Sequence, residues 1–406
     1  YWYIPSLLWI NASDTALSVL VWTGIAASLA ITLNLWPRVS IAIAGICFLS
    51  FVSAAQEFSS YQSDGMLLEA AFLSLFFAPR GIRPGFGLAS PPNRAALFLL
   101  QWEWFRIYFE SGLVKIMSGE PQWRNLTAMD KYYENGPLPT WLGWYVQHWP
   151  HGFHAASAGA TLAIELFVVW MLFLPKRARV VCFVITTALQ IGIILTANYA
   201  FLNYLVLCLG FLLLEDNVER RASSRVEMSR FAVVVLIVFF VTSIVVFLLP
   251  NVPVVNAPAI VLAPFRIVNT YGLFAVMTRA RYEIEFQGSR DLVHWTPYPF
   301  RYKPQDPHKR PGIFAPYQPR FDWNLWFASL GSVDENRWVL NVQARLMQNS
   351  PQVLELFAGN PFAGKPPVAV RAVAWQYWFS TPQEKQKLGV WWDRKFLGDY
   401  APIAAR

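Results

Sequence analysis

Residues 231–249 read FAVVVLIVFFVTSIVVFLL, a run without one charged side chain in which only Thr242 and Ser243 are polar. A helix needs about 20 largely apolar residues to cross the hydrocarbon core of a bilayer. Further runs of this kind, less uniform or shorter, occur near residues 16–36, 39–55, 66–79, 95–117, 155–174, 179–197 and 201–214. The sequence therefore predicts a polytopic α-helical membrane bundle with about eight spans.

The composition of the whole chain agrees with a membrane protein. Of its 406 residues, 55% are hydrophobic and only 14% are charged, whereas soluble domains carry about 25% charged residues. An aromatic content of 16% excludes a disordered chain. The net charge of +8 is not gathered in a dense Lys/Arg run, so we expect membrane lipid, and no nucleic acid, among the partners. The three cysteines lie in apolar runs, which predicts packing residues and no zinc site.

Basic residues in the loops predict the orientation of the bundle. One set of alternate loops holds eleven of them: Arg38, Arg80, Arg83, Arg94, Lys176, Arg177, Arg179, Arg220, Arg221, Arg225 and Arg230. The opposite set holds Arg124 and Lys131. Because cytoplasmic loops collect Lys and Arg, we expect the long loop 118–154 and the chain after the last span to lie outside the cytoplasm, in a bacterial periplasm or in the endoplasmic reticulum lumen.

Eight spans also place the first residue outside, which predicts that a further helix precedes this chain. The opening residues Tyr1, Trp2 and Tyr3 would then lie at the membrane interface.

The composition changes near residue 250, which predicts a bundle over 1–250 and a separate domain over 251–406. The second part has 18 Lys/Arg, 11 Asp/Glu and no run long enough to span a bilayer. Residues 281–286 alternate apolar and charged side chains, which predicts a strand with one buried and one exposed face. The alternation of Trp375, Tyr377 and Phe379 predicts another strand.

A helix is expected between these strands. Ser350 and Pro351 are typical of an N-cap followed by the first helical position, so the helix would run through Phe357. Strands on both sides of helices predict an extracytoplasmic α+β domain.

Charged side chains inside predicted spans are the first candidates for a functional site, because charge is expensive at membrane depth. These residues are Glu69, Glu103, Arg106, Glu110, Lys115 and Glu165. On one helix, Glu103, Arg106 and Glu110 stand at i, i+3 and i+7, so both carboxylates can flank the guanidinium. We expect these acids and Arg106 to form a buried structural clamp, as we do for Glu69 and Glu165.

Lys115 lies about 120° or more around the same helix from that triad. Two interpretations stay open. As a structural residue, it would pair with an acid or a carbonyl, or reach the interface. As a catalytic base, it would need a pocket beneath the 118–154 loop and few carboxylates nearby.

The 118–154 loop is long and rich in aromatic residues, which is uncommon unless a loop packs on another part of the protein or binds something. Aromatic side chains here and in the later domain are candidate contacts with a client or partner: Trp123, Tyr132, Tyr133, Trp141, Tyr317, Trp323 and Trp326. His148, His151 and His154 are spaced at i, i+3 and i+6, and Pro150 interrupts any helix through them. Zinc-binding helices favour i, i+4 pairs, so we expect no metal site.

Segments along nearly the whole chain carry a family resemblance. In the first part they are Gln62 with Asp64, Leu67-Leu-Glu69, Phe105-Arg-Ile-Tyr-Phe-Glu-Ser-Gly-Leu-Val-Lys115, Trp123-Arg124, Leu126-Thr127, Met129-Asp130, Tyr133-Glu134, Pro137-Leu-Pro139 and Thr196-Ala-Asn-Tyr199 with Phe201 and Asn203. In the second part they are Asn269-Thr-Tyr-Gly-Leu-Phe274, Lys303-Pro304, Asp306-Pro307, Arg310-Pro311, Pro316-Tyr317, Arg320, Asp322-Trp323, Trp326-Phe327 and Asn360-Pro-Phe-Ala-Gly364. Together these segments resemble the lipase maturation factor family.

The resemblance implies a polytopic protein with a lumenal or periplasmic domain that, in animals, helps secreted dimeric lipases to reach their active fold. The domain over 251–406 has no cysteine, which puts a thiol-linked role in doubt and favours a bacterial member. Gly112-Leu-Val-Lys115 is also similar to the transmembrane domain of vitamin K-dependent gamma-carboxylase, in which a lysine after a glycine is the catalytic base.

Three functions follow as hypotheses. The first is a membrane-anchored folding, maturation or assembly factor for secreted or membrane proteins. The second is an intramembrane enzyme with Lys115 as base, which would need a quinol-type cofactor; the sequence identifies no cofactor pocket. The third is an accessory subunit of a larger membrane complex, since small residues such as Gly24, Ala27 and Gly45 permit close helix contacts.

Overall fold

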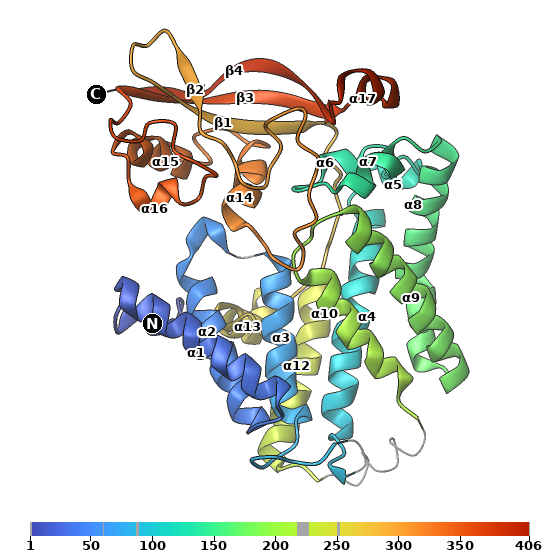
Figure 1. The fold of residues 1–406 in the computed structure, drawn as a ribbon. Helices are drawn as coiled ribbons and strands as arrows, with labels where there is room; N and C mark the ends of the chain where they lie inside the picture. Colours follow the sequence, from blue (N-terminus) through green and yellow to red (C-terminus); the bar gives the residue numbers. More distant parts are fainter. Residues whose placement is uncertain (1, 60, 87–88, 217–226, 250–251, 406) are drawn as a thin grey trace. The chain divides into compact units, whose positions relative to one another are not determined.

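The computed structural model describes residues 2–59, 61–86, 89–216, 227–249 and 252–405. Tyr1 and three arginines used to predict the orientation, Arg220, Arg221 and Arg225, lie outside the described residues, as does the predicted boundary at residue 250. Figure 1 shows a mainly helical part and a part built on one sheet.

The chain forms two compact units, each assembled from three segments. The membrane unit comprises Tyr1–Glu120, Gly159–Gln190 and Leu202–Val276, and the sheet unit comprises Pro121–Ala158, Ile191–Phe201 and Met277–Arg406. The predicted long outer loop thus belongs, almost entirely, to the same unit as the C-terminal part of the chain.

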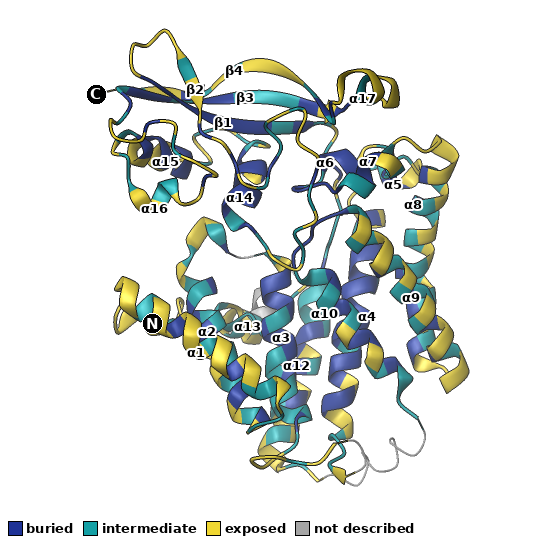
Figure 2. Cartoon of the chain, in the orientation of Figure 1, coloured by how far each residue is buried: buried dark blue, intermediate teal, exposed yellow. Residues whose placement is uncertain are grey.

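The secondary structure of the membrane unit is helical. They are α1 (Asp14–Thr32), α2 (Pro37–Ala54), α3 (Gln62–Phe77), α4 (Arg94–Met117), α10 (Leu202–Gly210), α12 (Arg230–Leu248) and α13 (Pro253–Leu262), with parts of α8 (His151–Leu166) and α9 (Lys176–Thr196). Most of α4 is buried, whereas α1 exposes much of its length (Figure 2). The core includes Trp104, Phe105 and Tyr108 of α4 with Met66 and Leu73 of α3.

Five helical segments in the described residues are long and apolar enough to cross a membrane. They are Asp14–Thr32, Pro37–Ala54, His151–Phe173, Lys176–Thr196 and Arg230–Leu248. All eight predicted segments are helical over most of their length, but the count of eight spans is not confirmed. Residues 202–214 form only a short apolar helix, α3 has 16 residues, and α4 carries the charged residues discussed below.

The sheet unit is built on four antiparallel strands in the order β2-β1-β3-β4. They are β1 (Arg281–Ser289), β2 (Trp295–Pro297), β3 (Ala369–Phe379) and β4 (Trp392–Ala405). The strands predicted at 281–286 and around Tyr377 are confirmed, and Ile284 pairs with Ala374 across them. Helices α14 (Arg320–Ala328) and α15 (Trp338–Met347) pack against this sheet (Figure 1).

Further short helices complete the sheet unit: α5 (Pro121–Arg124), α6 (Tyr132–Asn135), α7 (Trp141–Gln147), α16 (Pro351–Leu354) and α17 (Pro382–Leu388). The expected helix from Ser350 through Phe357 was too long. Ser350 is at the N-cap position, but its side chain makes no capping bond there and its hydroxyl binds Gln352 instead. The helix ends at Leu354, because Leu356 and Phe357 donate to carbonyls three residues earlier and Phe357 forms a β-bridge with Phe300.

The expectation that β1 exposes one face was wrong. Its charged side chains, Arg281, Glu283 and Glu285, are buried, as are Ile284 and Phe286 on the alternate face. The sheet is therefore covered on both faces at β1, because segments that precede and follow the strand supply partners for the charges.

Candidate functional site

One buried arginine lies at the centre of the membrane unit. Arg106 of α4 is 2% exposed and forms an ion pair with Glu69 of α3, and its Nη1 lies 4.0 Å from a carboxylate oxygen of Glu110. The same Nη1 donates to the carbonyl oxygen of Asn269 at 2.9 Å. The ring of Tyr271 lies 5.3 Å from the guanidinium carbon. We refer to Arg106, Glu69, Glu110, Asn269 and Tyr271 as the Arg106 cluster.

Side chains around Arg106 bind the backbone N–H groups of the irregular segment 269–273. The amide N–H of Asn269 donates to Glu69 at 3.0 Å, that of Tyr271 donates to Glu110 at 2.8 Å, and that of Leu273 donates to the Ser111 hydroxyl at 3.3 Å. The Tyr271 hydroxyl also donates to Glu69 at 3.0 Å. Side chains of α3 and α4 thus replace the hydrogen bonds that a helix would supply.

Asn269 fits closely against α3 at Gly65. Its side-chain amide donates to the Gly65 carbonyl at 3.1 Å and to Glu69 at 2.8 Å. A Cβ atom at residue 65 would lie 2.5 Å from the Asn269 side-chain oxygen. Only glycine leaves room for this contact.

The predicted triad needs a correction. Glu110 flanks Arg106 as expected, but Glu69 is the closer partner. Glu103 is fully buried, and neither of its carboxylate oxygens has a hydrogen bond of normal geometry within the described residues. Helical spacing predicted contacts along α4, whereas the main partner comes from another helix.

Lys115 belongs to a separate pair on α4. Its Nζ lies 2.8 Å from both carboxylate oxygens of Glu165 on α8. The two helices meet closely at Gly112, where an added Cβ would lie 2.8 Å from that of Glu165. Pairing with an acid is the arrangement expected of a structural lysine. The catalytic role of Lys115 stays a prediction.

The sheet unit has its own central arginine. Arg281 of β1 donates to the carbonyl oxygens of Glu134, Gly136 and Pro137. Glu283 lies 2.5 Å from Arg281 and 2.8 Å from Lys303, and all three side chains are at most 2% exposed. These residues form the Arg281 cluster, with Glu134, whose carboxylate accepts the amide N–H of Phe379 at 3.0 Å.

Asn198 ties three segments of the sheet unit together. Its side-chain nitrogen donates to the carbonyls of Leu138 and Gly312, at 2.9 and 3.0 Å. Its side-chain oxygen accepts the amide N–H groups of Phe314 and Ala315, at 2.6 and 3.0 Å. The sequence patterns gave no role to Asn198, Arg281 or Lys303. Asn198 and Lys303 lie in segments that carry the family resemblance, whereas Arg281 was noted only as part of a predicted strand.

Asp322 borders the Arg281 cluster. Its carboxylate accepts the amide N–H of Lys303 at 3.0 Å. Burial raises the pKa of Asp322 above its ordinary value, although this hydrogen bond and the nearby Lys303 charge oppose the rise. The acid therefore holds its proton more readily in the folded protein.

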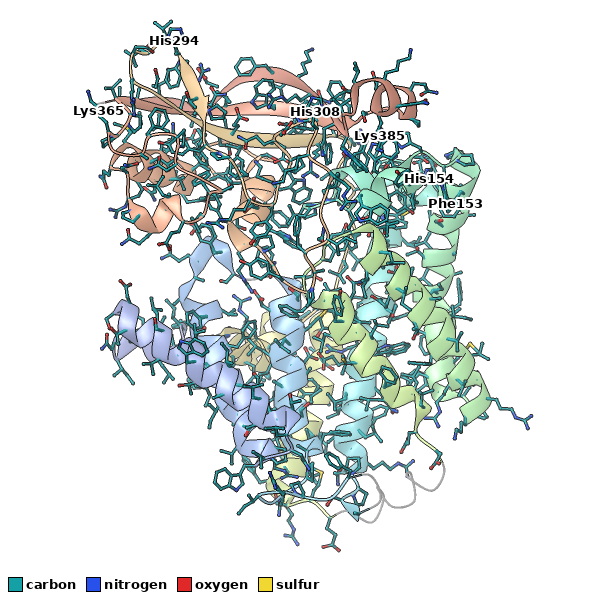
Figure 3. All side chains as sticks on the ribbon, viewed as in Figure 1. Phe153, His154, His294, His308, Lys365 and Lys385 are labelled. Carbon is teal, nitrogen blue, oxygen red and sulfur yellow. The ribbon has the colours of Figure 1, made fainter. Side chains whose placement is uncertain are left out.

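Most of the aromatic contact candidates lie in the interior. Trp123, Tyr132, Tyr133, Trp323 and Trp326 are buried, Trp141 is half-buried, and Tyr317 is 58% exposed. Their role as client contacts stays a prediction, for which Tyr317 offers the most surface. Lys385 of α17 (Figure 3) lies over the rings of Trp144 and Trp391, 5.3 and 4.1 Å from their centroids.

The histidines of the long loop have separate local partners. His151 lies 2.9 Å from Asp130, His148 contacts the Trp144 carbonyl, and His154 is buried beside Tyr133. Figure 3 shows His294 and His308 at different places on the sheet unit. Within the described ranges no three His, Cys, Asp or Glu side chains are grouped to hold a metal ion.

Comparison with known proteins covers both units. The lipase maturation factor transmembrane domain matches residues 1–221, and the lipase maturation factor C-terminal domain matches residues 267–402. Human lipase maturation factor 1 is 32% identical over 98% of this chain and 77% of its own length. Chicken lipase maturation factor 2 is 27% identical over 99% of this chain and 74% of its own length. No solved structure matches.

The apolar helices and these matches show that the chain is an integral membrane protein similar in sequence to lipase maturation factors. All residues of the Arg106 cluster and of the Arg281 cluster fall within the two matched regions. The chain belongs to the lipase maturation factor family.

Proposed function

We propose that the chain is a membrane-anchored maturation factor whose sheet unit binds a secreted or membrane-protein client while that client folds. The observation that carries the proposal is the match of both family domains along nearly the whole chain. The sheet unit would lie outside the cytoplasm, on the side where secreted clients fold. This location rests on the loop charges described above.

The surface of the sheet unit supports client binding. β4 is the last strand of the sheet and exposes Phe396 and Leu397, at 48% and 47%, and Ile403, at 47%. A long edge strand with exposed apolar side chains can pair with an extended segment of another chain. Both central arginines, in contrast, are buried and hold their own unit together, which suits a rigid scaffold.

Crosslinking at single positions tests this proposal. A photoreactive amino acid replaces Tyr317, Leu388 or Phe396, which are 58%, 64% and 48% exposed on the sheet unit, or Trp22 of α1, which is 69% exposed, as the control. The variants are expressed with a secreted dimeric lipase in cells lacking their own maturation factor. We expect lipase to be captured from sheet-unit positions and not from Trp22.

Secreted lipase activity gives the functional readout in the same cells. We expect the specific activity of the lipase to rise when the chain is present. Unchanged lipase activity, together with no capture from any sheet-unit position, would contradict the proposal.

A further inference from the structure

A large apolar cavity lies within the membrane unit, among α1, α2, α3 and α10. Its volume is about 810 Å³, and its wall includes Leu20, Gly24, Gly45, Leu68 and Leu205. Sites for small molecules span about 300–1,000 Å³. Apolar and small side chains dominate the wall, so the cavity suits a hydrocarbon chain.

A second cavity, of about 330 Å³, has a mixed wall, in which apolar residues such as Phe76 and Met228 stand beside charged and polar ones. Arg38, Arg80, Asn93 and Ser229 contribute to it, together with Glu227. Its described wall therefore holds two guanidinium groups and one carboxylate. The side chain of Arg38 is anchored, because its Nε donates to the Ala78 carbonyl at 2.7 Å. Within the described ranges, no ion pair neutralises Arg38 or Arg80.

The two cavities adjoin each other along α2 and α3. Phe77 is in the wall of both, and Arg38 and Ile41, about one helical turn apart on α2, belong to the basic and the apolar cavity respectively. A third cavity, of about 390 Å³, shares Leu212 with the apolar cavity and Ser90 with the basic cavity. The three cavities thus share wall residues, and we refer to them together as a path with an apolar end at the first cavity and a basic end at the second.

We propose that this path binds one anionic phospholipid, with its hydrocarbon in the apolar cavity and its phosphate at Arg38 and Arg80. In an integral membrane protein, lipid tails are the available molecules for an apolar cavity of this size. Arginine binds phosphate oxygens through paired, charge-assisted hydrogen bonds. Basic pockets beside membrane helices recognise anionic headgroups in the same way. An anionic amphiphile has an apolar part for the apolar cavity and a negative charge for the basic cavity.

Native mass spectrometry of the full chain tests the headgroup contacts. The protein is purified in mild detergent and titrated with palmitoyl-oleoyl phosphatidylglycerol or with the phosphatidylcholine of identical tails. We expect one phosphatidylglycerol to be retained in preference to phosphatidylcholine. Arg38→Gln/Arg80→Gln, and to a smaller degree Arg80→Gln alone, should weaken phosphatidylglycerol retention by about tenfold or more. Arg83→Gln is the control, since Arg83 is exposed and outside these walls.

A cavity-filling substitution tests the tail contacts without deleting a charge. A Cβ atom at Gly45 meets no atom within 4 Å, so Gly45→Leu should fit and occupy part of the apolar cavity. Gly159→Leu on α8, where a Cβ is equally unhindered, is the matched control. We expect Gly45→Leu to reduce retention of both lipids at least severalfold, and Gly159→Leu to leave it unchanged.

Three results would overturn the proposal. The first is equal retention of the two lipids by the unmodified chain. The second is phosphatidylglycerol retention that does not change in Arg80→Gln and the double variant. The third is retention unaffected by Gly45→Leu, which would place the lipid elsewhere on the protein.

Discussion

The Arg106 cluster and the Arg281 cluster both supply hydrogen-bond partners to buried backbone groups, but through different side chains. In the membrane unit, the guanidinium pairs with a carboxylate of a neighbouring helix, and the two acids Glu69 and Glu110 hold the backbone N–H groups of segment 269–273. In the sheet unit, the guanidinium itself binds three backbone carbonyls of residues 134–137. Arg281 therefore fixes the end of α6 and the residues after it, whereas segment 269–273 is held mainly by the acids beside Arg106.

The difference lies in which backbone groups are satisfied. Segment 269–273 needs acceptors for its N–H groups, and acids supply them; residues 134–137 need donors for their carbonyls, and Arg281 supplies them. Loss of Arg281 therefore leaves three carbonyls without this donor and Glu283 with Lys303 as its remaining partner. Loss of Arg106 leaves the Asn269 carbonyl without this donor and Glu69 without its cation.

The largest effect is expected for Arg281→Met. Removing one partner of a buried, hydrogen-bonded charge pair costs about 3–5 kcal/mol, and here three carbonyls lose a donor as well. We expect a sharp fall in the yield of folded protein, measured by fluorescence-detected size exclusion. Arg290→Met is the control, because Arg290 is exposed. Equal yields for the two variants would show that the Arg281 cluster is not structural.

Arg106→Met should be the next most harmful, at about 3 kcal/mol. Because Glu69 is then left charged and unpaired, Arg106→Met/Glu69→Gln should be more stable than the sum of the two single effects. Thermal unfolding in detergent of the three variants checks this coupling. Simple additivity would mean that the ion pair between α3 and α4 contributes nothing.

Asn198→Ala should cost about 2 kcal/mol, since the buried side chain makes four hydrogen bonds to backbone groups. Asn198→Asp should also destabilise, because a carboxylate cannot donate to Leu138 and Gly312. Limited proteolysis near residues 312–315 provides the measurement. An aspartate variant as resistant as the unmodified chain would indicate that the two donated bonds are unimportant.

The smallest effect concerns pH. The pKa of Asp322 is raised in the folded protein, so the folded state keeps a proton that the unfolded state loses. The stability contributed by Asp322 is present below its ordinary pKa and falls as the pH rises towards the raised value, by at most about 1.4 kcal/mol per pH unit. Unfolding temperatures across this range should decline less for Asp322→Asn than for the unmodified chain. Identical declines would contradict the assignment.

The sequence predicted the two clusters unequally. Arg106 and its acids stand out because charges are rare within apolar runs. Arg281, Glu283 and Glu285 alternate with apolar residues, which is also the pattern of a solvent-facing strand. Nothing in that pattern shows that Lys303 or the backbone of residues 134–137 covers the charged face. A charged residue in an apolar run thus indicates a buried polar site. A charged residue in a strand with alternating apolar and charged side chains does not show whether it is buried or exposed.

Distance along the chain limited the remaining predictions. Helical spacing gave the contact between Arg106 and Glu110, four residues apart, but not the bonds from segment 269–273, which is about 160 residues from Glu110 and 200 from Glu69. Lys115 and Glu165 were each singled out as buried charges, but their pairing depends on the close helix approach at Gly112. Contacts of this kind are set by packing, which local patterns do not contain.

Hydrogen exchange of segment 269–273 tests most directly whether buried charges fix an irregular segment. The full chain in lipid nanodiscs is exchanged into deuterated buffer and the peptides covering these residues are followed by mass spectrometry. We expect the amides of Asn269 and Tyr271, which donate to Glu69 and Glu110, to exchange slowly in the unmodified chain and faster in Glu69→Gln/Glu110→Gln. Exchange at the rate of an open loop in the unmodified chain would contradict this role for the Arg106 cluster.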